Sequence, residues 1–295
     1  KAFKKLETLT IAEAPIKDLK PLETLASTLK SLELRELPAT DLSPVGALTG
    51  LESLTVYDVA ATDLSPLGSL TALKKLDAQQ ESSAPLDFLE KLVTLEVADL
   101  SLREPPSWKP LGKLTSLVEL EVAATNMKDL SPMSKLTQLK SLSVLNTAVK
   151  NLKGVERFPQ LESLDVSMTK VKNLGPLKKL KGLKELSLAG TPVGAIKVLE
   201  SMTGLERVNL SDTKVKSLGA LSKLKELQSI QLVDAPVRDL APLMELPNLR
   251  DVNVHDSKVS LKQAEALAET LRSRHDFVRV KGPDGEYLED PSEGE

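Results

Sequence analysis

A period of about 22 residues runs through most of this chain and limits its fold more than any other feature. Steps of one period from Leu32 to Val252 meet an aliphatic residue every time, and Leu9 precedes Leu32 by one residue more than a period. Self-similarity at a period of about 20 to 50 residues is typical of solenoids, in which each coil packs only against its neighbours. The sequence therefore predicts twelve stacked coils. Their anchor positions are Leu9, Leu32, Leu54, Leu76, Ala98, Leu120, Leu142, Leu164, Leu186, Val208, Ile230 and Val252.

Each anchor opens a short alternating segment. In Leu164-Asp-Val166 the two apolar residues share one face of a strand and point inward, while the residue between them points outward. Because each coil is so short, the return path has no room for a long helix. Prolines recur there in Asp/Asn-Leu-x-Pro segments, where a fixed φ suits a tight turn. They are Pro21, Pro44, Pro66, Pro132, Pro176 and Pro242.

The pattern LxxLxLxxTxVxxLxxL, which starts at Leu139, resembles the leucine-rich-repeat family and most closely its internalin-like 22-residue bacterial class. The resemblance covers residues 3 to about 259. It implies an α/β fold, a right-handed horseshoe solenoid with a concave parallel β-sheet and 3₁₀ or irregular convex turns. The family usually places Asn five residues after the anchor, where it bonds the backbone of the next coil. This chain has threonines there, and we expect a looser ladder because a hydroxyl bridges fewer groups than a carboxamide. They are Thr125, Thr147, Thr169, Thr191 and Thr213.

Three segments are predicted: the solenoid over 1–259, a helix and strand cap over 260–281, and a disordered acidic tail over 282–295. Ser260 with Gln263 is typical of a capping box at the start of a helix. Residues 277–280 are expected to form a last strand that covers the final coil. The tail carries six acids and no base, which favours disorder. Because the chain begins at Lys1 without Met, we expect a processed chain or a fragment, and the resemblance favours the cell envelope or exterior of a bacterium.

The sequence offers little sign of catalytic or metal chemistry. There is no cysteine, no phosphate-binding loop, no dinucleotide fingerprint and no HExxH motif. His255 stands beside Asp256 and is interpreted as a solvated surface histidine, since no nucleophile is indicated nearby. No apolar run approaches the roughly 18 residues that span a bilayer. We therefore expect neither an enzyme nor a cofactor or resident metal.

The outward columns of the predicted strands carry more acids than bases, although the net charge is only −3. Like charges stacked across neighbouring strands are destabilising, and a basic partner would relieve that repulsion. Apolar and aromatic residues interrupt the acids, as anchors do within a charged rim. The expected partner-binding residues are Tyr57, Asp77, Asp99, Leu102, Glu121, Leu145, Asp165, Met168, Asp212, Asp234 and Asp256.

Other interpretations of these charges stay open. The acids could serve only solubility, or Asp212, Asp234 and Asp256 could hold a calcium ion, because hard cations favour several carboxylate oxygens. A basic flank could engage a phosphate backbone or an anionic lipid surface, although solvated lysines are the preferred interpretation. Neither nucleic acid nor a membrane surface is therefore the expected partner. The lysines of this flank are Lys128, Lys150, Lys172 and Lys216.

The sequence thus predicts a monomeric, non-enzymatic solenoid that recognises another protein with a basic surface through an acidic concave face. The alternative is a scaffold, or an inhibitor or immunity-type subunit of a larger assembly. Two local expectations accompany this hypothesis. Glu81 and Arg103 lie one coil apart and should pair. Trp108 occupies the column of Leu86 and Leu130 and should belong to the core.

Overall fold

A computed structural model describes residues 5–79 and 83–288, and the chain separates into two compact units, Lys1–Ala148 and Val149–Glu295. Each of the twelve predicted anchors lies in a strand. Within each unit the strands pair in parallel and in chain order. Unit 1 contains β1 (Thr8–Ala12), β2 (Ser31–Leu37), β3 (Ser53–Val59), β4 (Lys75–Gln79), β5 (Val97–Asp99), β6 (Glu119–Glu121) and β7 (Ser141–Ser143). Unit 2 contains β8 (Ser163–Asp165), β9 (Glu185–Ser187), β10 (Arg207–Asn209), β11 (Ser229–Gln231), β12 (Asp251–Asn253) and β13 (Arg279–Lys281).

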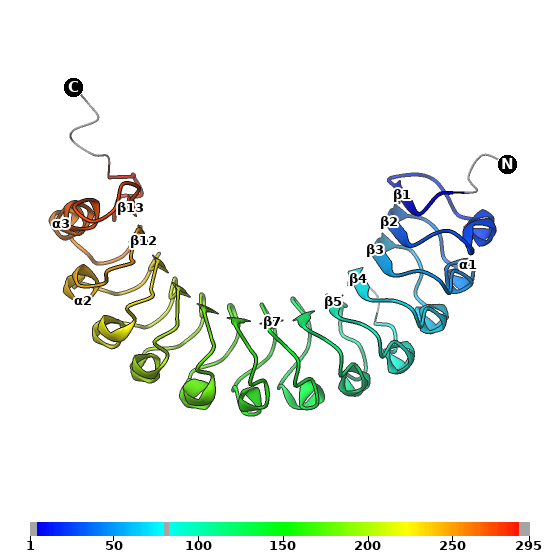
Figure 1. Ribbon diagram of the computed structural model, residues 1–295, viewed down its shortest axis with the longest axis horizontal. Coiled ribbons are helices and arrows are strands. Elements are labelled where there is room, and N and C mark those ends of the chain that lie inside the picture. The colour runs from blue at the N-terminus through cyan, green and yellow to red at the C-terminus, as the bar shows by residue number, and fades with distance from the viewer. Residues whose placement is uncertain (1–4, 80–82, 289–295) are drawn as a thin grey trace, which may run out of the picture. The chain divides into compact units, whose positions relative to one another are not determined.

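Short helical turns carry the chain from one strand to the next. In each unit the strands lie along the inner side of the curve and the turns along its outer side (Figure 1). This arrangement confirms the predicted leucine-rich-repeat solenoid fold. The turns of unit 1 are η1 (Lys20–Leu25), α1 (Ser43–Gly46), η2 (Ser65–Ser69), η3 (Asp87–Lys91), η4 (Lys109–Lys113) and η5 (Ser131–Met133). Those of unit 2 are η6 (Val155–Arg157), η7 (Gly175–Lys179), η8 (Lys197–Ser201), η9 (Gly219–Lys223) and α2 (Ala241–Met244), followed by the longer α3 (Leu261–Arg272).

The recurring Asp/Asn-Leu-x-Pro segments start these turns. In η2 the Asp63 carboxylate accepts a hydrogen bond of 2.8 Å from the backbone N–H of Ser65, and Pro66 occupies the first turn. Pro is tolerated there because its missing N–H would have no partner within the helix. The bond from Ser65 holds the pKa of Asp63 below its ordinary value of 3.8. Each motif therefore fixes the point at which a strand gives way to its return path.

Stacked leucines fill the interior of both units. Leu164 and Val166 are buried, and the equivalent pairs in neighbouring coils are buried as well. Trp108 is 8% exposed, and its Nε1 donates a hydrogen bond of 2.9 Å to Asn126 Oδ1, which confirms its predicted place in the core. Burying the indole is compatible with stability because its one polar atom is bonded.

The threonines five residues after the anchor are buried, but they do not bond the next coil as the family resemblance implied. Thr169 Oγ1 donates to the carbonyl of Val166 at 2.6 Å, and Thr191 Oγ1 donates to that of Leu188 at 2.6 Å. These bonds close a turn within one coil. The expectation of a ladder that bonds the next coil was therefore wrong, because the short threonine side chain reaches only its own backbone. Thr125, Thr147 and Thr213 make the same bond.

The cap begins as predicted, and the ordered part extends further than predicted. Ser260 caps α3 with Gln263 in a capping box, and β13 pairs in parallel with β12. Beyond β13 the chain turns back, since Leu288 N–H donates to Val280 O at 2.9 Å. The predicted disorder is therefore wrong for residues 282–288, whose return covers the open edge of the last strand. Residues 289–295, and Glu81 with its expected partner bond, lie outside the described residues.

Candidate functional site on the strand faces

Three of the predicted binding acids lie on successive strands of unit 1. Asp77 stands opposite Asp99, and Asp99 stands opposite Glu121, in register across β4, β5 and β6. All three side chains are only partly exposed. Asp99 is well bonded, because Ser101 donates from N at 3.1 Å and from Oγ at 2.7 Å, and Gln79 Nε2 donates at 2.9 Å. With Glu119 on β6, these residues form what we call the acidic patch.

Asp77 is the least satisfied member of the acidic patch. Its Oδ1 is buried and has no hydrogen-bond partner among the described residues. Burial raises the pKa of Asp77 above its ordinary value of 3.8, and the neighbouring Asp99 carboxylate raises it further. A hydrogen bond from Gln79 and the charges of Arg35 and Lys75 act in the opposite direction. The ionised Asp77 therefore lacks the donor that a buried carboxylate oxygen needs.

An aromatic residue lies beside the acidic patch. Tyr57 on β3 is paired in register with Gln79 on β4 and is 36% exposed. The Arg35 guanidinium stands 5.7 Å from the centre of the Tyr57 ring and also pairs with Glu33. This arrangement fixes the ring against the sheet by a cation–π contact while one edge stays open to solvent.

Leu102 is not an exposed anchor. It is 1% exposed, which contradicts the prediction. In most coils a left-handed residue follows the strand at the fourth position after the anchor, but in this coil it is Glu104, two residues later. The shift turns Leu102 into the core. Leu145, which was predicted with it, is partly exposed.

Asp212, Asp234 and Asp256 occupy left-handed turns, with φ of 49°, 56° and 54°. Asp and Asn tolerate this conformation better than most residues, so backbone geometry accounts for this acidic column. All three side chains are exposed. In the described part of the chain no group of three or more His, Asp or Glu is placed to hold a metal ion, so the calcium hypothesis gains no support. Met168, at 61% exposure, occupies the same turn position with φ of 56°.

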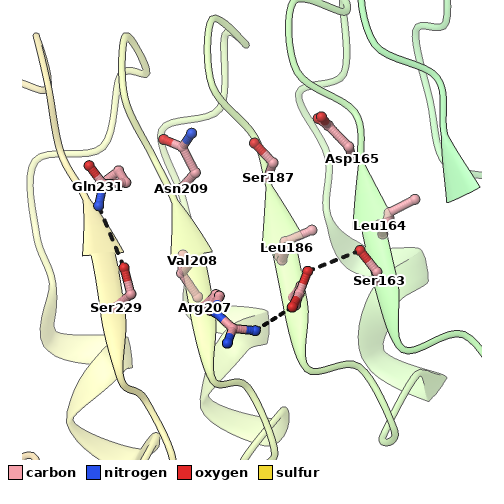
Figure 2. Close-up of a pocket in the computed structure, with 11 residues that line it drawn as sticks. Ser163, Leu164, Asp165, Leu186, Ser187, Arg207, Val208, Asn209, Ser229 and Gln231 are labelled. Carbon is pink, nitrogen blue, oxygen red and sulfur yellow. Dashed lines mark hydrogen bonds and ion pairs between the residues drawn. The ribbon is translucent and has the colours of Figure 1, made fainter. Parts of the chain in front are cut away.

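Asp165 belongs to a different site, on the strand face of unit 2. There an open depression of about 300 Å³ lies over β8 to β11 (Figure 2). Asp165, Ser187, Asn209 and Gln231 face each other in register on these four strands. We call this site the polar depression. The sequence interpretation missed it, although the small Ser163 and Ser229 beside larger polar residues were a readable signal.

The polar groups of the depression are partly bonded to one another. Glu185 pairs with Arg207 and accepts a hydrogen bond of 3.4 Å from Ser163 Oγ. Asp165 Oδ1 accepts from the backbone N–H of Ser167 at 2.8 Å. Asn209 Oδ1 makes the same bond to Ser211 N–H at 3.0 Å. The bonds of Asp165 and Asn209 to the backbone form a turn at the end of β8 and of β10, and they hold the two side chains in place.

The remaining predicted features stay on the surface. Lys128, Lys150, Lys172 and Lys216 are exposed, and none makes an ion pair with another described residue. His255 Nε2 lies 3.3 Å from Asp256 Oδ2. Across residues 5–79 and 83–288, no helix has both the length and the apolar character that crossing a membrane requires.

Comparisons with known proteins agree with this geometry. A family model described as the leucine-rich-repeat domain of the endo-β-N-acetylglucosaminidase EndoS matches residues 139–235. Internalin InlF of Listeria monocytogenes superposes with a TM-score of 0.69 at 22% identity, over 86% of this chain and 82% of that one. The chain has the leucine-rich-repeat fold. No curated protein sequence matches it.

Two further structures share the leucine-rich-repeat fold. A leucine-rich-repeat protein of Leptospira interrogans gives a TM-score of 0.67 at 18% identity, over 92% of this chain and 89% of that one. The functional domain of InlJ from Listeria monocytogenes, which includes a cysteine ladder, gives 0.66 at 19% identity, over 84% and 53%. At these identities the likeness concerns the fold, which is internalin-like. The chain itself contains no cysteine.

Proposed function

We propose that this leucine-rich-repeat protein is a non-enzymatic binding module that recognises the basic surface of another protein through the acidic patch. The observation that carries the proposal is Asp77, a half-buried carboxylate with an unpartnered oxygen among the described residues, directly opposite Asp99. A lysine or arginine of a partner would supply the missing donor and offset the repulsion between the two carboxylates. Tyr57 lies close enough to act as an aromatic anchor at the rim.

Unit 2 supports the proposal by contrast. Its strand-face acids Glu185 and Asp251 are already paired with Arg207 and Arg279. Asp165 is bonded to the backbone of Ser167. We therefore place the binding face on strands β4 to β6 of unit 1, where Asp77 stands opposite Asp99 and Asp99 stands opposite Glu121.

Affinity capture from the native organism tests the proposal. We would compare the wild type with Asp77→Asn/Asp99→Asn, in which the new carboxamide oxygen at position 99 still accepts from Ser101 N–H. The control is Asp212→Asn/Asp234→Asn, which changes the net charge equally and suits left-handed turns. Proteins with basic surfaces should be retained by wild type and control and lost from the acidic-patch variant. Equal retention by all three baits would contradict the proposal.

A further inference from the structure

The polar depression of unit 2 has more hydrogen-bonding capacity than its own residues use. Asn209 uses Oδ1 for Ser211, while the N–H groups of its Nδ2 have no partner among the described residues. Asp165 likewise uses Oδ1 and leaves Oδ2 open in that part of the chain. Gln231 Nε2 makes one long bond of 3.5 Å to Ser229 Oγ, and its Oε1 is open within the described ranges. Figure 2 shows these side chains in one row with Ser187, which lies between Asp165 and Asn209.

The depression is unsuited to an apolar anchor. Its apolar lining residues, Leu164, Leu186 and Val208, are at most 2% exposed and belong to the core below. A ligand that covered this floor would desolvate amides and a carboxylate, which is costly unless each finds a new partner. The ligand must therefore itself be dense in donors and acceptors.

The charges around the depression cancel except for one carboxylate. The Arg207 guanidinium is paired with Glu185, so these two charges neutralise each other. Only Asp165 remains without an ionic partner among the described lining residues. The row across the strands offers a carboxylate acceptor at Asp165, amide donors at Asn209 and an amide acceptor at Gln231. The Ser187 hydroxyl in the same row is bonded to Ser167 Oγ at 2.6 Å and keeps one further hydrogen-bonding position.

We propose that the polar depression binds a neutral oligosaccharide laid across β8 to β11. A sugar hydroxyl both donates and accepts, so successive hydroxyls match a row that changes between acceptor and donor. At about 4.8 Å per strand the row extends over roughly 14 Å, which suits a short chain of sugars. This binding is separate from the protein recognition proposed for the acidic patch, so either can fail alone.

Titration of the full chain with cellohexaose, maltohexaose and hexa-N-acetylchitohexaose, followed by backbone amide NMR, tests the proposal. At least one sugar should shift signals of β8 to β11. Asn209→Asp retains the acceptor for Ser211 N–H and removes both amide donors, so Kd should rise about tenfold or more, which corresponds to about 1.4 kcal/mol. The matched control is Asn253→Asp on β12, because Asn253 makes the same turn bond, to His255 N–H at 3.1 Å, outside the depression. Asn253→Asp should bind as wild type does.

A second arm tests whether the ligand is neutral. Asp165→Asn retains the bond to Ser167 N–H, removes the charge and replaces the open Oδ2 acceptor by an amide donor, so Kd for the sugar should rise, as for Asn209→Asp. Hexalysine should not shift the β8 to β11 signals of the wild type. The proposal is overturned if none of the three sugars binds, or if Asn209→Asp and Asn253→Asp weaken binding equally. Hexalysine binding in the depression that Asp165→Asn abolishes would also overturn it, in favour of a cationic protein side chain.

Discussion

At the scale of single residues, aspartates have three different structural roles in this repeat. Asp63 starts a return turn, Asp99 closes a strand by accepting Ser101 N–H, and Asp212 occupies a left-handed turn. Each job is local and explains an acid without reference to a partner. Asp77 differs, because one of its oxygens is buried and has no bonded partner among the described residues. None of these three local roles explains the presence of Asp77.

Replacing Asp77 by Asn should stabilise the protein at neutral pH. Because the pKa of Asp77 is raised in the folded state, the folded protein holds this proton more tightly than the unfolded chain. Ionisation of Asp77 therefore lowers the free energy of unfolding as the pH rises through the raised pKa. Asp77→Asn should increase that free energy at pH 7 by up to about 1 kcal/mol, the scale of a cross-strand like-charge pair. Urea unfolding would measure it.

The same comparison at acidic pH is the control. At a pH well below 3.8, Asp77 is protonated in both the folded and unfolded states, so the wild type and Asp77→Asn should be equally stable. A stabilisation of the same size at both pH values would show that repulsion is not its cause.

At the scale of the element, periodicity predicted the strands and proline predicted the turns. Strands and turns both depend on residues that are close in sequence, so the sequence alone can predict them. The prediction for Leu102 was wrong because the left-handed residue of this coil is Glu104, two positions later than in most coils. The spacing of apolar residues does not indicate this change in backbone conformation. The threonine bonds were misassigned for a related reason, since the family resemblance concerned the longer Asn side chain.

The threonine bond offers a test of this element. Thr169→Val retains the shape of the side chain but leaves the buried carbonyl of Val166 without its donor. The free energy of unfolding should fall by about 1 to 2 kcal/mol. Thr169→Ser restores the hydroxyl and should recover most of that loss. Equal losses in Val and Ser variants, measured by urea unfolding, would attribute the effect to packing of the methyl group.

At the scale of the whole molecule, the two units share the same repeat fold but differ in the chemistry of their strand faces. The strand face of unit 1 places carboxylates opposite one another on β4 to β6. On that of unit 2, Glu185 is paired with Arg207, and amides of Asn209 and Gln231 stay open among the described residues. The repeat positions predicted which acids lie on the strand face. They did not predict which of these acids form ion pairs, because pairing depends on the side-chain conformations of neighbouring coils. The polar depression was missed for the same reason, since it arises where small serines adjoin larger residues.

The association rate of a partner retained in the capture, measured over a series of salt concentrations, tests the role of the acidic patch most directly. Complementary charges accelerate encounter, and the effect is screened within about 10 Å at 0.1 M salt. Wild type should associate about tenfold faster than Asp77→Asn/Asp99→Asn at low salt, and the two rates should converge as salt rises. Equal rates at low salt would contradict recognition through the acidic patch.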